Sequence, residues 1–240
     1  MSRRPTFLLP VLIAITGVTA SAIELSPETT TAWNRYVATA VSHLHEGDSP
    51  SCSADPIGSA IDIDGGTIHH WKGSTVVHGT TVDKVVHSLM RRGIPPPQDD
   101  VLESRVMGRN GNSLRVYLKL ARSAIVTVVY HTEHDVTFTR HSAALAASRS
   151  VSTKIVETDG SDRGFLWRLN SYWRYIQAGE DVRIDLESLS LSRDIPFVVR
   201  PVASPVISRI ARESVARTLS SVKRFLEKGG PAELQASCLR

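Results

Sequence analysis

The chain has 240 residues, with 28 lysine and arginine residues against 24 aspartate and glutamate residues, and a formal net charge of +4 at pH 7. This length fits one domain with a full hydrophobic core. So small a net charge gives no reason to expect a nucleic-acid partner.

The first 22 residues have the three parts of a secretory signal peptide. Arg3 and Arg4 form a positive start, residues 7–18 are an uncharged apolar run, and Ala20-Ser21-Ala22 is a small-residue cleavage site. A membrane anchor is disfavoured, because the run is shorter than the roughly 20 residues that a spanning helix needs. We therefore expect residues 1–22 to be removed and the protein to be secreted or periplasmic, with no stable membrane span afterwards. The remaining chain has 26 basic and 24 acidic residues, a net charge of +2.

Residues 23–60 are expected to form an N-terminal helix and a loop before the main domain. Ser26-Pro27-Glu28 is typical of a helix start, with a capping serine, a proline in the first turn and an acid near the positive helix end. Apolar residues then recur at helical spacing to about His45. Gly47–Gly58 is rich in Ser, Pro, Asp and Gly, which indicates a loop.

The chain has two cysteines, Cys52 in this loop and Cys238 near the C-terminus. An oxidising compartment permits a disulfide between them, and such a bond would close a long loop. Two free thiols are the equal alternative, because the sequence does not give the distance between the Cα atoms.

Strand-like sequence begins at Ile61. Gly66–His78 reads as a strand with a break at Lys72-Gly73. Thr80 or Thr81 then caps a short amphipathic helix, which ends at Gly93 because three prolines follow it.

Six strands are expected next, with almost no helix between them. Asn110-Gly111 is a strong hairpin signal, and strict alternation of apolar residues from Leu114 to Leu120 predicts a half-buried strand. The predicted strands are Val101–Gly108, Leu114–Ala121, Ile125–Phe138, Ala146–Val156, Phe165–Ile176 and Val182–Leu191.

A long helix is predicted from Ile195 to about Leu226, with Pro201 and Pro205 expected to kink or interrupt its first part. Residues 228–240 are expected to be a loose tail. Since the strands follow one another through short turns, the sheet should be antiparallel. Its apolar face needs a cover, and the terminal helix is the obvious one. The sequence therefore predicts an α+β fold.

This order of elements resembles the helix-grip, or START-like (SRPBCC), superfamily, over roughly residues 61–227. Local stretches are similar to uncharacterised exported bacterial members of it. These stretches are Thr132-Glu133-His134-Asp135-Val136, Gly164-Phe165-Leu166-Trp167-Arg168-Leu169-Asn170-Ser171-Tyr172-Trp173-Arg174, Leu189-Ser190-Leu191-Ser192-Arg193-Asp194-Ile195-Pro196 and Arg212-Glu213-Ser214. The resemblance implies a curved antiparallel sheet wrapped around a long C-terminal helix, with an apolar cavity between them. Superfamily members include START lipid-transfer domains, coenzyme Q-binding proteins and polyketide cyclases, so the fold alone does not decide the chemistry.

The strand Phe165–Ile176 supplies the candidate cavity residues. By alternation, Trp167, Ser171 and Trp173 share its apolar face, and Ser188 lies on the apolar face of the last strand. Small residues among large ones leave room for a ligand. The alternative is that both tryptophans are only core.

A histidine-rich stretch offers a second set of candidates. A metal site is disfavoured there, because His131 and His134 lie three apart on a strand and point to opposite faces. His131, Glu133 and Arg149 are candidates to contact a ligand if they point inward, and an ion pair on the outer face is the alternative. Motifs for a serine or cysteine nucleophile and a phosphate-binding loop are absent from the sequence.

The leading hypothesis is an exported START-like domain that binds an apolar small molecule, such as a lipid or an isoprenoid, without a cofactor. One alternative is a cyclase or hydratase with His131 or Glu133 as general base. The other is a structural or partner-binding protein with a filled core.

Overall fold

The computed structural model describes residues 25–43, 55–92, 98–123, 127–194 and 200–227. The predicted signal peptide, Cys52, Cys238 and the C-terminal tail lie outside the described residues, so the predictions made for them stay predictions. The elements in chain order are α1 (Pro27–His43), β1 (Ile57–Ile63), β2 (Gly66–Val77), α2 (Val82–Arg92), β3 (Val101–Asn110), β4 (Ser113–Ser123), β5 (Thr127–Arg140), β6 (Leu145–Glu157), β7 (Arg168–Ala178), β8 (Asp181–Arg193) and α3 (Arg200–Leu226).

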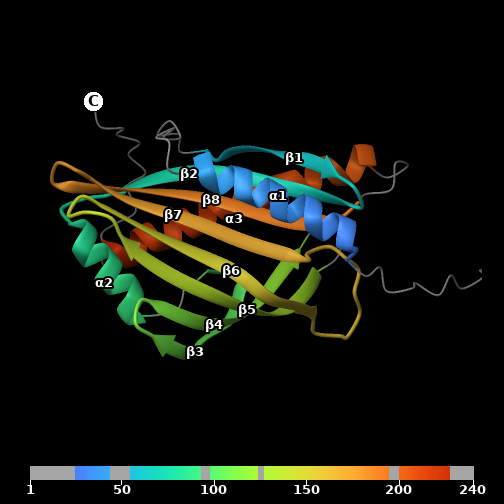
Figure 1. Cartoon of the computed structure of the whole chain (residues 1–240), viewed down its shortest axis with the longest axis horizontal. Helices are drawn as coiled ribbons and strands as arrows, with labels where there is room; N and C mark the ends of the chain where they lie inside the picture. The colour runs from blue at the N-terminus through green and yellow to red at the C-terminus, as the bar shows by residue number, and fades with distance from the viewer. Residues whose placement is uncertain (1–24, 44–54, 93–97, 124–126, 195–199, 228–240) are drawn as a thin grey trace, which may run out of the picture.

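The strands form one antiparallel sheet of eight strands in the order β1-β2-β8-β7-β6-β5-β4-β3 (Figure 1). Strands β3 to β8 follow one another as neighbours, and β8 returns to pair with β2. The predicted hairpin turn joins β3 to β4, where Gly111 has the positive φ of 54° that such turns require. The fold class is therefore α+β of the helix-grip type, as predicted.

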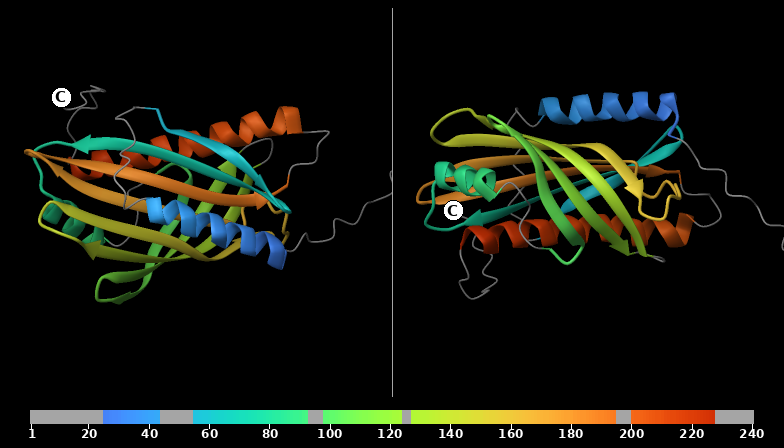
Figure 2. Two further views of the ribbon diagram at one scale, coloured as in Figure 1. Left: turned by 45° about the horizontal axis from the view of Figure 1, so that its top comes forward. Right: turned by 90° about the horizontal axis from the view of Figure 1, so that it is seen from below.

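The long helix α3 and the N-terminal helix α1 lie on opposite faces of the sheet (Figure 2). On the α3 face, Val215 and Leu219 pack with Leu186 of β8. The helix approaches β2 closely at Gly73, where an added Cβ would lie only 2.8 Å from Leu219 Cδ1. The sheet thus curves over α3, while its other face is partly covered by α1.

Helix α1 is attached to the sheet by both apolar and polar contacts. Ser26 caps it, since its Oγ accepts a hydrogen bond from the Thr29 backbone N–H at 3.1 Å. Trp33 is buried in a cluster with residues of β2 and β8. The Tyr36 hydroxyl lies 2.8 Å from His70 Nδ1, and the other ring nitrogen of His70 contacts the buried Glu187. Helix α1 precedes the residues that resemble the superfamily, but it is packed as part of the same domain.

Helix α2 lies across one end of the sheet. Thr81 rather than Thr80 caps it, because the Lys84 backbone N–H points to Thr81 Oγ1 at 3.4 Å. Val82 and Val85 are buried with Tyr175, Val182 and other residues of the sheet. Val222 of α3 belongs to the same cluster, so α2 packs against both the sheet and α3 at this end.

Several predicted boundaries were wrong. The first strand begins at Ile57, inside the predicted loop. Strand β2 runs unbroken through Gly73, which pairs with Leu186 of β8. The missing side chain gives α3 room to approach at this position. Helix α3 is continuous through Pro205, so the predicted interruption there is absent. Strand β7 begins at Arg168, later than the predicted start at Phe165.

Candidate functional site

A cavity of about 200 Å³ lies between the sheet and α3. Its walls come from β4 to β8, from α3, from Leu89 of α2 and from the segment before β3. The lining is largely apolar, with Leu114, Val116, Leu118, Leu120, Val136, Phe138, Leu169, Trp173, Leu186, Val215 and Val222. Apolar walls with a few polar groups are typical of a site for a small molecule.

Three serines explain why there is room in the middle of this wall. In the sheet register Ser150 pairs with Ser171, and Ser171 pairs with Ser188, so the three side chains form a row across β6, β7 and β8. The larger Leu169 and Trp173 lie on either side of Ser171 along β7 and also line the cavity. Within the described part of the chain, the Ser171 and Ser188 hydroxyls have no hydrogen-bond partner. These two hydroxyls are consequently available to a ligand.

Charged and amide side chains lie where the segment before β3 meets α3. Arg122, the last inward-facing residue of β4, has Nη1 2.7 Å from Asp100 Oδ2. Arg217 of α3 places Nη2 3.4 Å from the same oxygen. The Thr218 hydroxyl lies 2.9 Å from Gln98 Oε1. These contacts link the segment before β3 to α3 and give the cavity a polar region.

His134 is a buried imidazole in the cavity wall. Thr132 Oγ1 donates to the Leu118 carbonyl at 3.1 Å, so it accepts the hydrogen bond from His134 Nε2, 3.0 Å away. This assigns the proton to Nε2 and leaves Nδ1 as an acceptor, 3.5 Å from Ser150 Oγ. Burial, helped by the positive charge of Arg122, lowers the pKa of His134 to about 4. The imidazole is therefore neutral at pH 7 and accepts hydrogen bonds on its Ser150 side.

The seven predicted site residues divide into two groups. Ser171, Trp173 and Ser188 line the cavity. Trp167, His131, Glu133 and Arg149 do not. Ligand contact by the first three stays a prediction.

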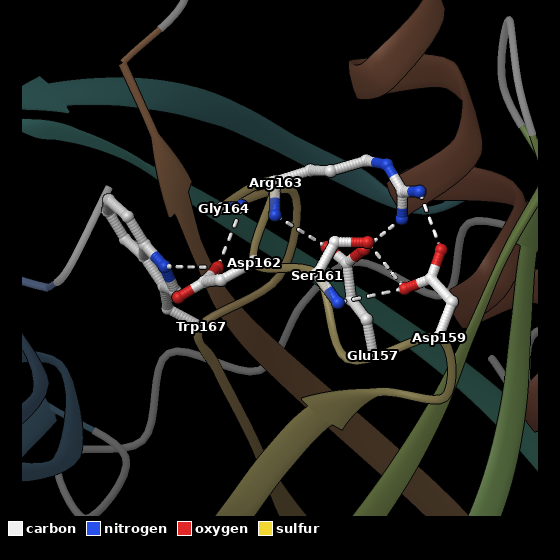
Figure 3. A network of polar contacts seen from close by, with 7 residues as sticks. All are labelled: Glu157, Asp159, Ser161, Asp162, Arg163, Gly164 and Trp167. Atoms are coloured by element: carbon white, nitrogen blue, oxygen red, sulfur yellow. Dashed lines mark hydrogen bonds and ion pairs between the residues drawn. The ribbon is translucent and has the colours of Figure 1, made fainter. Parts of the chain in front are cut away.

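Trp167 packs on the α1 face, in one cluster with Trp33, so the predicted alternation from Phe165 is wrong at this point. The loop after β6 explains the difference (Figure 3). Asp162 Oδ1 accepts hydrogen bonds from the Gly164 backbone N–H at 3.0 Å and from Trp167 Nε1 at 3.3 Å. Because Trp167 precedes the first residue of β7, this loop rather than the strand pleat sets its direction.

The same loop is held by an internal ion-pair network (Figure 3). Arg163 contacts the buried Glu157 and places Nη2 2.6 Å from Asp159 Oδ2. The hydrogen bond from Arg163 lowers the pKa of Asp159. Glu157 and Asp159 thus share Arg163 as their counterion.

His131, Glu133 and Arg149 lie on the outer face of the sheet, which corrects the inward placement considered above. On β5 the buried positions are Tyr130, Thr132 and His134, so the odd-numbered residues point away from the cavity. His131 Nδ1 lies 2.6 Å from the Tyr117 hydroxyl, and Glu133 pairs with Lys154 at 3.8 Å. Arg149 is exposed. The cyclase hypothesis required His131 or Glu133 to line the cavity as general base. Neither residue lines it, so the hypothesis is not supported.

Arg122, Asp100 and His134 were missed as site residues, although a signal was present for two of them. The alternation from Leu114 to Leu120 continues inward to Arg122. The apolar residues Val136 and Phe138 face inward with His134 on β5. Asp100 precedes its strand, so no periodicity could place it.

Among the residues that the structure describes, no group of three or more His, Cys, Asp and Glu side chains is arranged to hold a metal ion. No helix within the described ranges is both long and apolar enough to span a bilayer.

No protein-family model matches the chain, and no curated protein matches it. Solved structures do resemble it. A STAR-related lipid transfer protein from Xanthomonas axonopodis is 16% identical, with 71% of this chain and 99% of that chain covered and a TM-score of 0.47. The Zhui aromatase/cyclase from Streptomyces sp. R1128 is 14% identical, with 67% and 94% covered and a TM-score of 0.45.

Human STARD10 is 9% identical to this chain, with 78% of each chain covered and a TM-score of 0.48. At such identities the likeness concerns the fold alone. The helix-grip, or START-like, fold of this chain is given by its own sheet order and by the long C-terminal helix α3.

Proposed function

We propose that the protein binds a small, mainly apolar molecule in the cavity between the sheet and α3. The observation that carries the proposal is the 200 Å³ space itself, with an apolar wall and the free hydroxyls of Ser171 and Ser188. A filled core would leave no such space, because protein interiors pack with few voids larger than a water molecule.

The cavity volume limits the size of the ligand. An apolar cavity of about 150 Å³ binds benzene, so by proportion about 200 Å³ holds about eight carbon atoms. This is below the range of roughly 300–1,000 Å³ that suits drug-sized ligands. A short-chain or single-ring molecule fits whole, whereas a longer lipid or isoprenoid would place only one segment inside.

Titration calorimetry with octan-1-ol, a neutral probe of this size, tests the proposal. The wild-type protein should bind it at one saturable site. Ser171→Leu fills the space beside Trp173 and should abolish binding. Thr139→Leu places the same side chain at an exposed position of β5 and should leave binding unchanged. Equal binding by all three proteins, or none by the wild type, would show that the cavity is not the site.

We also propose that the protein acts outside the cytoplasm, on the strength of the signal-peptide pattern in residues 1–22. The natural ligand would then be a molecule of the envelope or the medium. N-terminal sequencing of the protein recovered from its own cells should begin at Ile23. A chain that still begins at Met1 contradicts export by this route.

A further inference from the structure

Arg122 brings unused hydrogen-bond donors to the cavity wall. A guanidinium has five N–H donors. Only Nη1 of Arg122 has partners in the described part of the chain, namely Asp100 Oδ2 at 2.7 Å and the Ala121 carbonyl at 3.2 Å. The donors on Nε and Nη2 are not among the buried unpartnered polar atoms, so they remain accessible. The open side of this guanidinium can therefore bind an acceptor.

Arg122 shares its carboxylate partner with a second guanidinium. Among the described residues, Asp100 is the one carboxylate that contacts Arg122, and its Oδ2 also lies 3.4 Å from Arg217 Nη2. One negative charge is thus shared between two guanidiniums. Glu213 reaches the other end of Arg217 at 3.7 Å, and solvent screens both of these charges, because the two side chains are 49% and 39% exposed. Arg122 is less exposed, at 23%, so its charge acts more strongly in the cavity.

The charge of Arg122 also acts on His134 in the cavity wall. The charge of Arg122 contributes to the lowered pKa of His134, which lines the same cavity. An apolar wall strengthens such interactions, because the effective dielectric constant is lower there than in water. Asp100 Oδ1 is buried without a partner, so it does not face the open space as a competing acceptor.

We infer that the ligand is a small apolar carboxylate, or another amphiphile with a single anionic group, whose anionic end binds the free donors of Arg122. This inference rests on the proposed function, because it assigns a chemical class to the ligand that binds in the same cavity. A guanidinium binds a carboxylate with two parallel hydrogen bonds, and such charge-assisted bonds are among the strongest in proteins. A cationic ligand would be repelled by the guanidinium, and a neutral one would lack these charge-assisted bonds.

Octanoate and octan-1-ol are matched probes for the test, because both have eight carbon atoms and only one is anionic at pH 7. Calorimetry on the wild-type protein should show octanoate binding at least about tenfold more tightly than octan-1-ol. In Arg122→Gln this preference should disappear, while the affinity for octan-1-ol stays within about twofold. Arg115→Gln is the matched control, since Arg115 lies on the same strand with an exposed side chain that pairs with Asp135 at 3.2 Å. That variant should keep the preference.

The single variant leaves Asp100 with Arg217 as its only described ion-pair partner. The double variant Asp100→Asn, Arg122→Gln removes both charges together, so it keeps the test valid if the single variant unfolds. It should bind octan-1-ol and lack the preference for octanoate. Equal affinity of the wild type for both probes, or an unchanged preference in the Arg122 variants, overturns the inference and leaves the proposed function standing. Failure of the wild type to bind either probe overturns both.

Discussion

A neutral histidine in the cavity wall makes the stability of this protein depend on pH. His134 is 3% exposed, and burial lowers its pKa to about 4, against 6.5 for a free histidine. Between these two values the unfolded chain binds a proton that the folded chain does not. The contribution of neutral His134 to the free energy of unfolding is therefore complete above pH 6.5. It decreases as the pH is lowered and is lost below about pH 4.

His134→Gln should remove this part of the pH dependence. Lowering the pH from 7 to 5 should reduce the free energy of unfolding of the wild type by about 2 kcal/mol more than that of the variant. Urea unfolding of both proteins at the two pH values measures the difference, and His69, whose pKa is also lowered to about 4 by burial, contributes equally to both. His87→Gln, at an exposed position of α2, should behave as the wild type. A parallel pH dependence in His134→Gln would contradict the neutral, buried state of His134.

Residue-level prediction from the sequence succeeded within strands and failed at their ends. The alternation of β7 correctly placed Ser171 and Trp173 toward the cavity. It failed at Trp167, because Asp162 and the loop before β7 determine the direction of that side chain. Side chains alternate between the two faces only where the strand is pleated. A residue outside the strand is positioned by tertiary contacts that a single sequence does not reveal.

At the scale of elements, a close contact between α3 and the sheet depends on one glycine. A Cβ at Gly73 would lie 2.8 Å from Leu219 Cδ1 and 3.2 Å from Val215 Cγ1, and both of these side chains are buried. The sequence led us to expect a break in the strand at this glycine. The structure instead gives it a packing role, because it lies in an unbroken strand under the helix.

Gly73→Ala should therefore lower the free energy of unfolding by about 1–3 kcal/mol, the usual cost of forcing extra atoms into a packed contact. Gly108→Ala is the control, since a Cβ at that position of β3 meets no atom within 4 Å. The free energy of unfolding of this control should be unchanged or slightly higher than that of the wild type. Chemical denaturation of the three proteins makes the comparison. Equal effects of the two substitutions would mean that α3 does not pack closely on β2.

At the scale of the whole molecule, the sequence predicted the architecture better than the site. The order of the strands and the long C-terminal helix sufficed for the helix-grip fold, because hydrophobic period and turn residues act locally. The packing of α1 through Trp33 and Tyr36 was not foreseen. Nor was the polar region of the cavity, since Asp100, Arg122 and Arg217 come from three separate segments that meet only in the fold.

The central claim is that the space beside Ser171 is a cavity and not a packed core. The free energy of unfolding of Ser171→Leu, relative to the wild type, tests this most directly. Because the Ser171 hydroxyl has no described partner and a leucine would fill empty apolar space, we predict an unchanged value or a gain of up to about 2 kcal/mol. A loss of more than about 1 kcal/mol, as overpacking of a filled core produces, would contradict it.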